Sequence, residues 1–149
     1  MKKKIKNIKN IRRTVCIMAN ELHKAGMTLS AAFKKAWQRV KESMTIRAAG
    51  TAFGNRQQKL AYIAQFHVEE LQVTLQREPE NPYDSDAVKV LIAVLPIRKY
   101  TEVGYLPKGL AKELAKVIDA GIPLKASLQG IIGGYGYKEN YGVLLNIAV

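Results

Sequence analysis

A short polar segment carries the residues of this chain that are best suited to chemistry. It runs from Arg77 to Asp84 and reads REPENPYD. Pro79 and Pro82 fix the backbone φ angle at two positions, so we expect a stiff turn. Such a turn would hold the Tyr83 ring where it can stack on a base, and the Asp84 carboxylate where it can accept a hydrogen bond from a ribose hydroxyl. The residue types leave a second interpretation open, in which Tyr83 packs under the loop and Asp84 caps it.

The sequence lacks the usual signatures of catalysis and metal binding. His23 and His67 are its two histidines, and both lie in a helical context away from any cysteine or carboxylate pattern. A single cysteine, Cys16, excludes the common zinc spacings and is expected to be a small buried apolar residue. We therefore predict a protein that is not an enzyme and takes no cofactor and no metal. The acids near the stiff turn also lack the spacing of a calcium loop; they are Glu78, Glu80, Asp84 and Asp86.

Positive charge is concentrated in the first third of the chain. The net charge of the 149 residues is +12 at pH 7; residues 1–47 hold 13 Lys and Arg against 2 acids, whereas residues 48–149 hold 11 against 10. A cationic segment attracts polyanions through counterion release, without sequence preference. A solubilising basic tail is the alternative. The predicted non-specific basic arm consists of Lys2, Lys3, Lys4, Lys6, Lys9, Arg12 and Arg13.

Hydropathy argues against a membrane protein. No apolar run approaches the ~18 residues of a membrane span. The run Val15–Ala19 is too short for the core of a signal peptide. A single cysteine is typical of a reducing compartment. The sequence thus predicts a cytoplasmic protein with one folded domain, a small appendage and no membrane partner.

Two helices are expected before residue 46. Apolar residues recur with helical spacing from Thr14, Gly26 interrupts the pattern, and Thr28 suits the cap of a second helix. The segment before Thr14 is expected to fray when it is free. A helix-turn-helix is conceivable, but a recognition helix needs a supporting third helix. The favoured interpretation is a hairpin that packs Trp37 and Phe33 on the rest of the domain or on a partner. Residues 1–45 are assigned to the basic arm and this hairpin.

Residues 46–149 predict a mainly β domain with short helices. About six short strands and two helices form an α+β pattern that suits a small closed, OB-like or SH3-like β-barrel of the kind that binds oligonucleotides. One helix should follow Asn55, and the other should span Gly109–Ala120 with Glu113 on its solvated face. The expected strands are Ile46–Phe53, Leu71–Arg77, Ala87–Leu95, Tyr100–Leu106, Leu124–Ile132 and Gly142–Val149.

Two motifs resemble the HIRAN domain, a small β-barrel found at the front of fork-remodelling helicases and free-standing in bacteria and phages. REPENPYD at residues 77–84 is followed by VGYLPK at residues 103–108, and the resemblance covers residues 46–149. It implies binding of DNA, and in particular of a single strand and its 3′ end, in DNA repair, replication or mobile-element biology. The alternative is a protein-interaction adaptor of a phage or plasmid, with a protein partner at the N-terminal hairpin and a vestigial nucleic-acid site.

The resemblance also implies roles for particular side chains. Tyr83 would stack on a terminal base, and Asp84 would hold the 3′ hydroxyl. Lys108 would reach a phosphate, and Asn81 would support the turn or contact the strand. Phe53 takes the place of a stacking tyrosine.

Other positions depart from the helicase members or complete the implied site. Tyr141 takes the place of an aromatic residue that packs on a base near the last strand. Ala52 and Glu80 stand where the helicase members have arginine and asparagine, and both changes remove favourable contact with a polyanion. Arg56 and Arg77 are expected to replace the lost charge.

Overall fold

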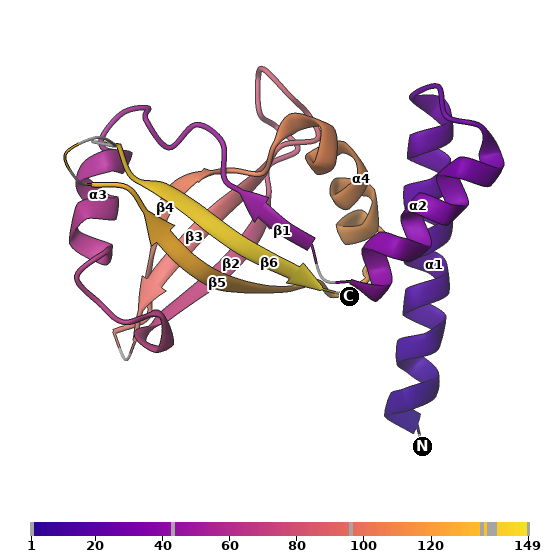
Figure 1. The fold of residues 1–149 in the computed structure, drawn as a ribbon, viewed down its shortest axis with the longest axis horizontal. Helices are drawn as coiled ribbons and strands as arrows, with labels where there is room; N and C mark the ends of the chain where they lie inside the picture. Colours follow the sequence, from indigo (N-terminus) through magenta and orange to yellow (C-terminus); the bar gives the residue numbers. More distant parts are fainter. Residues whose placement is uncertain (1, 43, 96, 135, 137–139, 149) are drawn as a thin grey trace.

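Six strands in two antiparallel sheets form the centre of the molecule, and helices lie at both ends (Figure 1). The computed structural model describes residues 2–42, 44–95, 97–134, 136 and 140–148; the side chains of residues 2–8 also lie outside its description. The first sheet has the order β1-β6-β5 and the second the order β2-β3-β4. The predicted α+β class, the six strands and the N-terminal helical hairpin are confirmed.

The first sheet pairs the first strand in the sequence with the last two. Its strands are β1 (Met44–Arg47), β5 (Lys125–Ile132) and β6 (Gly142–Ala148), with β6 in the middle. Leu145 of β6 pairs with Ile46 on one side and Leu128 on the other. This central place explains why β6 carries apolar residues on both faces.

The second sheet carries the turn that holds the candidate site. This turn connects β2 (Leu71–Arg77) to β3 (Val88–Val94), and the two strands pair with each other. β4 (Lys99–Tyr105) pairs with the other edge of β3. Val88, Val90 and Ile92 of β3 are buried against the first sheet and the helices. Alternation of apolar and polar residues had predicted β2 with these bounds.

The two sheets are not closed into a continuous barrel. At one junction Ala49, just after β1, exchanges two backbone hydrogen bonds with Tyr105 at the end of β4, at 2.7 and 2.9 Å. This close approach requires Gly104, because a Cβ there would lie 2.7 Å from the Ala49 carbonyl oxygen. At the other junction β2 lies beside β5 without a ladder. The predicted barrel is therefore a pair of packed sheets with one hydrogen-bonded seam.

The N-terminal hairpin packs on the helix that follows β4. α1 (Lys2–Lys24) and α2 (Leu29–Lys41) stand beside α4 (Lys108–Asp119), and α1 contacts α4 directly (Figure 1). Thr28 caps α2 as predicted, since its hydroxyl accepts a hydrogen bond from the Ala31 amide. α1 runs through the basic segment that was expected to fray. The hairpin shares one apolar cluster with the sheets, and the division at residue 45 stays a prediction.

Two side chains of the helices differ from their predicted environments, and the packing of Trp37 on a partner stays a prediction. α2 buries Ala32 and Ala36 beside α1, whereas Trp37 is 41% exposed. Cys16 is exposed, because α1 buries Val15 and Met18 on its inner face. Glu113, expected in solvent, is buried under the hairpin and forms an ion pair with Arg39 of α2.

The remaining helices lie at the end of the sheets away from the hairpin (Figure 1). α3 (Arg56–Ile63) buries Leu60 and Ile63, and the 3₁₀ turn Val68–Glu70 leads into β2. Asn55 precedes α3 as predicted, although its side chain makes no capping hydrogen bond. In the part of the chain that the structure describes, no helix has the length and apolar character needed to cross a membrane.

Candidate nucleic-acid interface

An open cleft of about 670 Å³ lies between the turn after β2, the loop before α3 and the start of α4. Each of these three segments contributes residues that the sequence had singled out. The cleft brings together Phe53, Arg56, Asn81, Tyr83, Asp84 and Lys108. The other lining residues are Ala49, Gly50, Glu78, Pro82, Ala87, Tyr105 and Leu106.

Hydrogen bonds hold the turn in one conformation. The Asn81 side-chain oxygen accepts from the backbone amides of Tyr83 and Asp84, at 2.9 and 3.0 Å. The amide group of Asn81 donates to Glu78 at 3.3 Å, and Asp84 Oδ1 accepts from the Asp86 amide at 2.9 Å. Asn81 therefore supports the turn from within.

Tyr83 does not pack under this loop. Its side chain is 93% exposed at the rim of the cleft, and Phe53 from the loop before α3 is 72% exposed. Large exposed rings are uncommon unless they serve a contact, because burial of an aromatic ring is favourable. The alternative in which Asp84 caps the turn is observed, but this bond uses one oxygen of its carboxylate.

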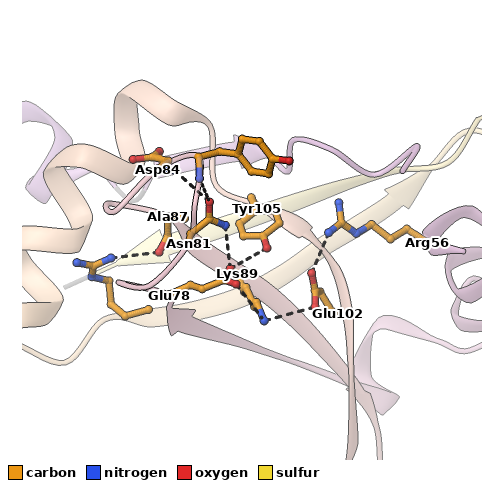
Figure 2. A network of polar contacts seen from close by, with 10 residues as sticks. Arg56, Glu78, Asn81, Asp84, Ala87, Lys89, Glu102 and Tyr105 are labelled. Atoms are coloured by element: carbon orange, nitrogen blue, oxygen red, sulfur yellow. Dashed lines mark hydrogen bonds and ion pairs between the residues drawn. The ribbon is translucent and has the colours of Figure 1, made fainter. Parts of the chain in front are cut away.

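A polar network forms the floor of the cleft (Figure 2). The Tyr105 hydroxyl donates to Glu78 Oε2 at 2.7 Å. Lys89 Nζ lies 3.7 Å from Glu78 and 3.6 Å from Glu102, and Arg56 donates to Glu102 at 2.8 Å. Arg56 also lies over the Tyr105 ring, with its guanidinium carbon 5.2 Å from the ring centre. Each of these two acids thus faces a cation, which limits its repulsion of a polyanion.

The network sets the protonation of its two central groups. Burial, and then the hydrogen bond to Glu78, raise the pKa of Tyr105 to about 12. The hydrogen bond from Tyr105 holds the pKa of Glu78 below its ordinary value. At neutral pH Tyr105 is therefore a neutral donor and Glu78 a charged acceptor, so the floor keeps one arrangement across the physiological range.

The start of α4 gives the cleft a positive edge. Lys108 is exposed and is the first residue of the helix, after Pro107 at the cap position. The amides of a first helical turn have no partners within the helix, and the helix dipole places partial positive charge there. A lysine at such a terminus is suited to a phosphate group.

Two of the eight predicted site residues lie away from the cleft. Arg77 donates to both carboxylate oxygens of Asp119, at 3.0 and 3.1 Å, and to the Ser85 and Ala87 carbonyls. This pairing holds the pKa of Asp119 below its ordinary value and ties the turn to α4. Tyr141 is half-buried against the core, and its backbone exchanges hydrogen bonds with the Gln57 side chain at 2.7 and 3.0 Å.

Sequence reasoning missed the residues of the floor. Glu78 and Tyr105 lie inside the two motifs, yet their hydrogen bond joins positions 27 residues apart. Lys89 of β3 lies 3.6 Å from Glu102 of the paired strand β4, although the register places Lys89 opposite Tyr105 and Glu102 opposite Leu91. Opposite charges on neighbouring strands were the signal available for them. Within the described residues, no group of three or more His, Cys, Asp or Glu side chains could hold a metal ion.

The basic arm lies on α1, which contributes no residue to the described lining of the cleft. Lys9 and Arg12 are exposed, and Arg13, also exposed, reaches the Ala120 carbonyl at 3.4 Å. The side chains of Lys2, Lys3, Lys4 and Lys6 lie outside the described residues.

A small two-sheet domain whose open cleft combines exposed rings with cations is typical of the oligonucleotide-binding class of modules. The family model of the HIRAN domain matches residues 41–132. The chain belongs to the HIRAN domain family, which confirms the resemblance of its two motifs. Membership supports a DNA-binding module in general.

The chain is also similar to three known proteins. The helicase-like transcription factor of Oryctolagus cuniculus is 42% identical over 75 residues, which cover 50% of this chain and 7% of that protein. Two solved structures are similar in fold, each with a TM-score of 0.48. The HIRAN domain of human HLTF is 24% identical, with 70% of this chain and 72% of that one covered. A protein from Lactobacillus plantarum is 20% identical, with 72% and 95% covered.

Proposed function

We propose that this protein is a non-catalytic module that binds single-stranded DNA and reads the 3′ end of the strand in the cleft. The observation that carries the proposal is the turn, which presents Tyr83 at 93% exposure beside the Asp84 carboxylate in the cleft that Phe53 also lines. Every base has a flat face, so stacking on two exposed rings binds a strand without sequence preference.

Each side chain of the cleft has a distinct part in this proposal. Tyr83 and Phe53 stack on bases, and Lys108 with the start of α4 binds a phosphate. Asp84 uses one oxygen for the turn and keeps acceptor capacity for a terminal 3′ hydroxyl. Arg56 is held by Glu102 and by the Gly50 carbonyl, so it positions the rim and adds positive potential.

The basic arm adds affinity without selectivity. Exposed cations on α1 attract phosphates of any sequence, and they lie on a different part of the molecule from the cleft. End selectivity and salt-sensitive affinity should therefore be separable by mutation.

Removal of one ring tests the stacking role. Tyr83→Ala should reduce the affinity for a short single strand by ~1–3 kcal/mol, because one base loses its stacking partner. The measurement is fluorescence anisotropy at fixed salt, and Tyr100→Ala is the matched control because Tyr100 is exposed outside the cleft. Equal affinities of the parent and a folded Tyr83→Ala protein would contradict the proposal.

The adaptor remains a second candidate because of the outer side of α2. Leu29 and Trp37 are 51% and 41% exposed there, which suits a protein contact better than solvent. The two candidates differ in their response to salt. Tight single-strand binding that weakens steeply as salt rises supports the DNA module, whereas weak binding at low salt supports the adaptor.

A further inference from the structure

A second groove lies beside α3, lined by residues other than those of the cleft. It encloses about 380 Å³ between α3 and the strands β3 and β4. A smaller hollow of about 220 Å³ connects the two sites: it shares Phe53 and Arg56 with the cleft and Lys59 with the groove. The three depressions therefore form one path along α3.

Charge along this path suits a polyanion. Lys59 and Lys99 line the groove, and no acid is among its described lining residues. Glu102 lines the connecting hollow, but it accepts from Arg56 at 2.8 Å and lies 3.6 Å from Lys89. The acid of the hollow is thus paired with two cations, and the two lysines of the groove have no acid among the groove's described lining residues.

Two exposed rings flank two cations along the same path, in the order Phe53, Arg56, Lys59 and Tyr62. Arg56, Lys59 and Tyr62 recur every third residue, so they follow one side of α3. Tyr62 is 56% exposed in the groove. Phe66 makes an edge-to-face contact with it, at 5.4 Å between ring centres and 70° between planes, which fixes the orientation of the Tyr62 ring. Cations for the phosphates together with exposed rings for the bases suit a single strand.

We infer that this side of α3 binds the nucleotides that lie 5′ of the strand end held in the cleft. The inference rests on the proposed function. Phe53 stands between the two sites, Lys59 and Lys99 contact phosphates, and Tyr62 stacks on an internal base. The occupant is therefore the continuing sugar-phosphate backbone of the same DNA strand.

Oligonucleotide length tests the path separately from the cleft. A trinucleotide fills the cleft alone, whereas a strand of about ten nucleotides reaches the groove, because site sizes of such folds are about 4–16 nucleotides. The parent protein should bind the longer strand more tightly. Tyr62→Leu keeps an apolar contact for Phe66 but has no ring. In this variant the ratio of the affinity for the longer strand to that for the trinucleotide should fall about 5-fold or more, and the trinucleotide affinity itself should not change.

Matched variants complete the test. Tyr62→Phe should retain the gain, because it keeps the ring. Lys59→Ala and Lys99→Ala should each reduce the gain, whereas Lys125→Ala, an exposed lysine on β5, should not. If the parent binds the longer strand more tightly and folded Tyr62→Leu and Lys59→Ala proteins keep this increase in affinity, the path along α3 is refuted, but the proposed role of the cleft is not. Equal losses for both lengths also overturn the path. Absence of trinucleotide and longer-strand binding in the parent overturns the proposed function itself.

Discussion

The ion pair between Arg39 and Glu113 should hold the hairpin against α4. Glu113 lies on α4 with an 8% exposed side chain, and Arg39 on α2 is 26% exposed. Arg39→Ala would leave the carboxylate buried without its main partner. Removal of one member of a buried ion pair lowers the free energy of unfolding by about 3–5 kcal/mol. Because Arg39 is partly exposed, we expect a loss of about 3 kcal/mol.

The loss of stability in Arg39→Ala should be larger at neutral pH than at acidic pH. Burial raises the pKa of Glu113 above its ordinary value; Arg39 and Lys35 lower this pKa, and Glu21 raises it. A carboxyl with a raised folded pKa stabilises the fold below its unfolded pKa, and this contribution is lost as pH rises through the folded pKa. Without Arg39 the pKa rises more, so the destabilisation should be full at neutral pH and small at about pH 4.

Urea unfolding at several pH values measures this effect. Lys34→Ala is the control, because it removes one exposed charge from the same helix. In a Glu113→Gln background, Arg39→Ala should have a much smaller effect, since no charge is left unpaired. An equal loss of stability for Arg39→Ala at acidic and neutral pH, or no loss at all, would refute the reasoning.

Three further predictions concern the turn, the arm and the domain boundary. Asn81→Ala should lower the free energy of unfolding by about 1–3 kcal/mol, because two backbone amides lose their acceptor. Thermal melts measure this loss. Asn55→Ala is the control, because the side chain of Asn55 makes no capping hydrogen bond. Deletion of residues 2–13 should reduce the slope of log affinity against log salt by several units, because each phosphate contacted in a single strand contributes ~0.7. An unchanged slope would show that the arm does not contact DNA. A chain that begins at Thr45 should fold cooperatively but melt at a lower temperature, since α4 loses contact with α1; a shortened chain that stays unfolded would place the hairpin inside the domain.

Local patterns predicted the parts of the fold that depend on local physics. The alternation in Leu71–Arg77 identified β2, and the helical stripe after Pro107 identified α4 within one residue. The first strand was predicted through Phe53 but ends at Arg47. Beyond Arg47 the chain turns at Gly50 and Gly54, which adopt φ angles of +69° and +59°. Residue types alone did not distinguish these turns from a continuing strand.

Long-range partners decided the places of the site residues. Tyr83 and Asp84 depend on a turn closed by Asn81, two and three residues away. Arg77 depends on Asp119, which is 42 residues away, and that partner takes its guanidinium out of the cleft. Glu113 was assigned to solvent because nothing in its own helix signals that α2 covers it. Tertiary pairing of this kind leaves no periodic trace in the sequence.

The central claim is that the cleft reads the 3′ end of a single strand, and the affinity for two forms of that end tests it most directly. Fluorescence anisotropy compares one short oligonucleotide with a 3′ hydroxyl and with a 3′ phosphate, for the parent and for Asp84→Asn. The asparagine keeps an oxygen that can accept from the Asp86 amide, so the turn should stay folded. The account predicts that the parent prefers the hydroxyl end and that Asp84→Asn loses this preference while it still binds the strand. Equal affinity of the parent for both ends would contradict it.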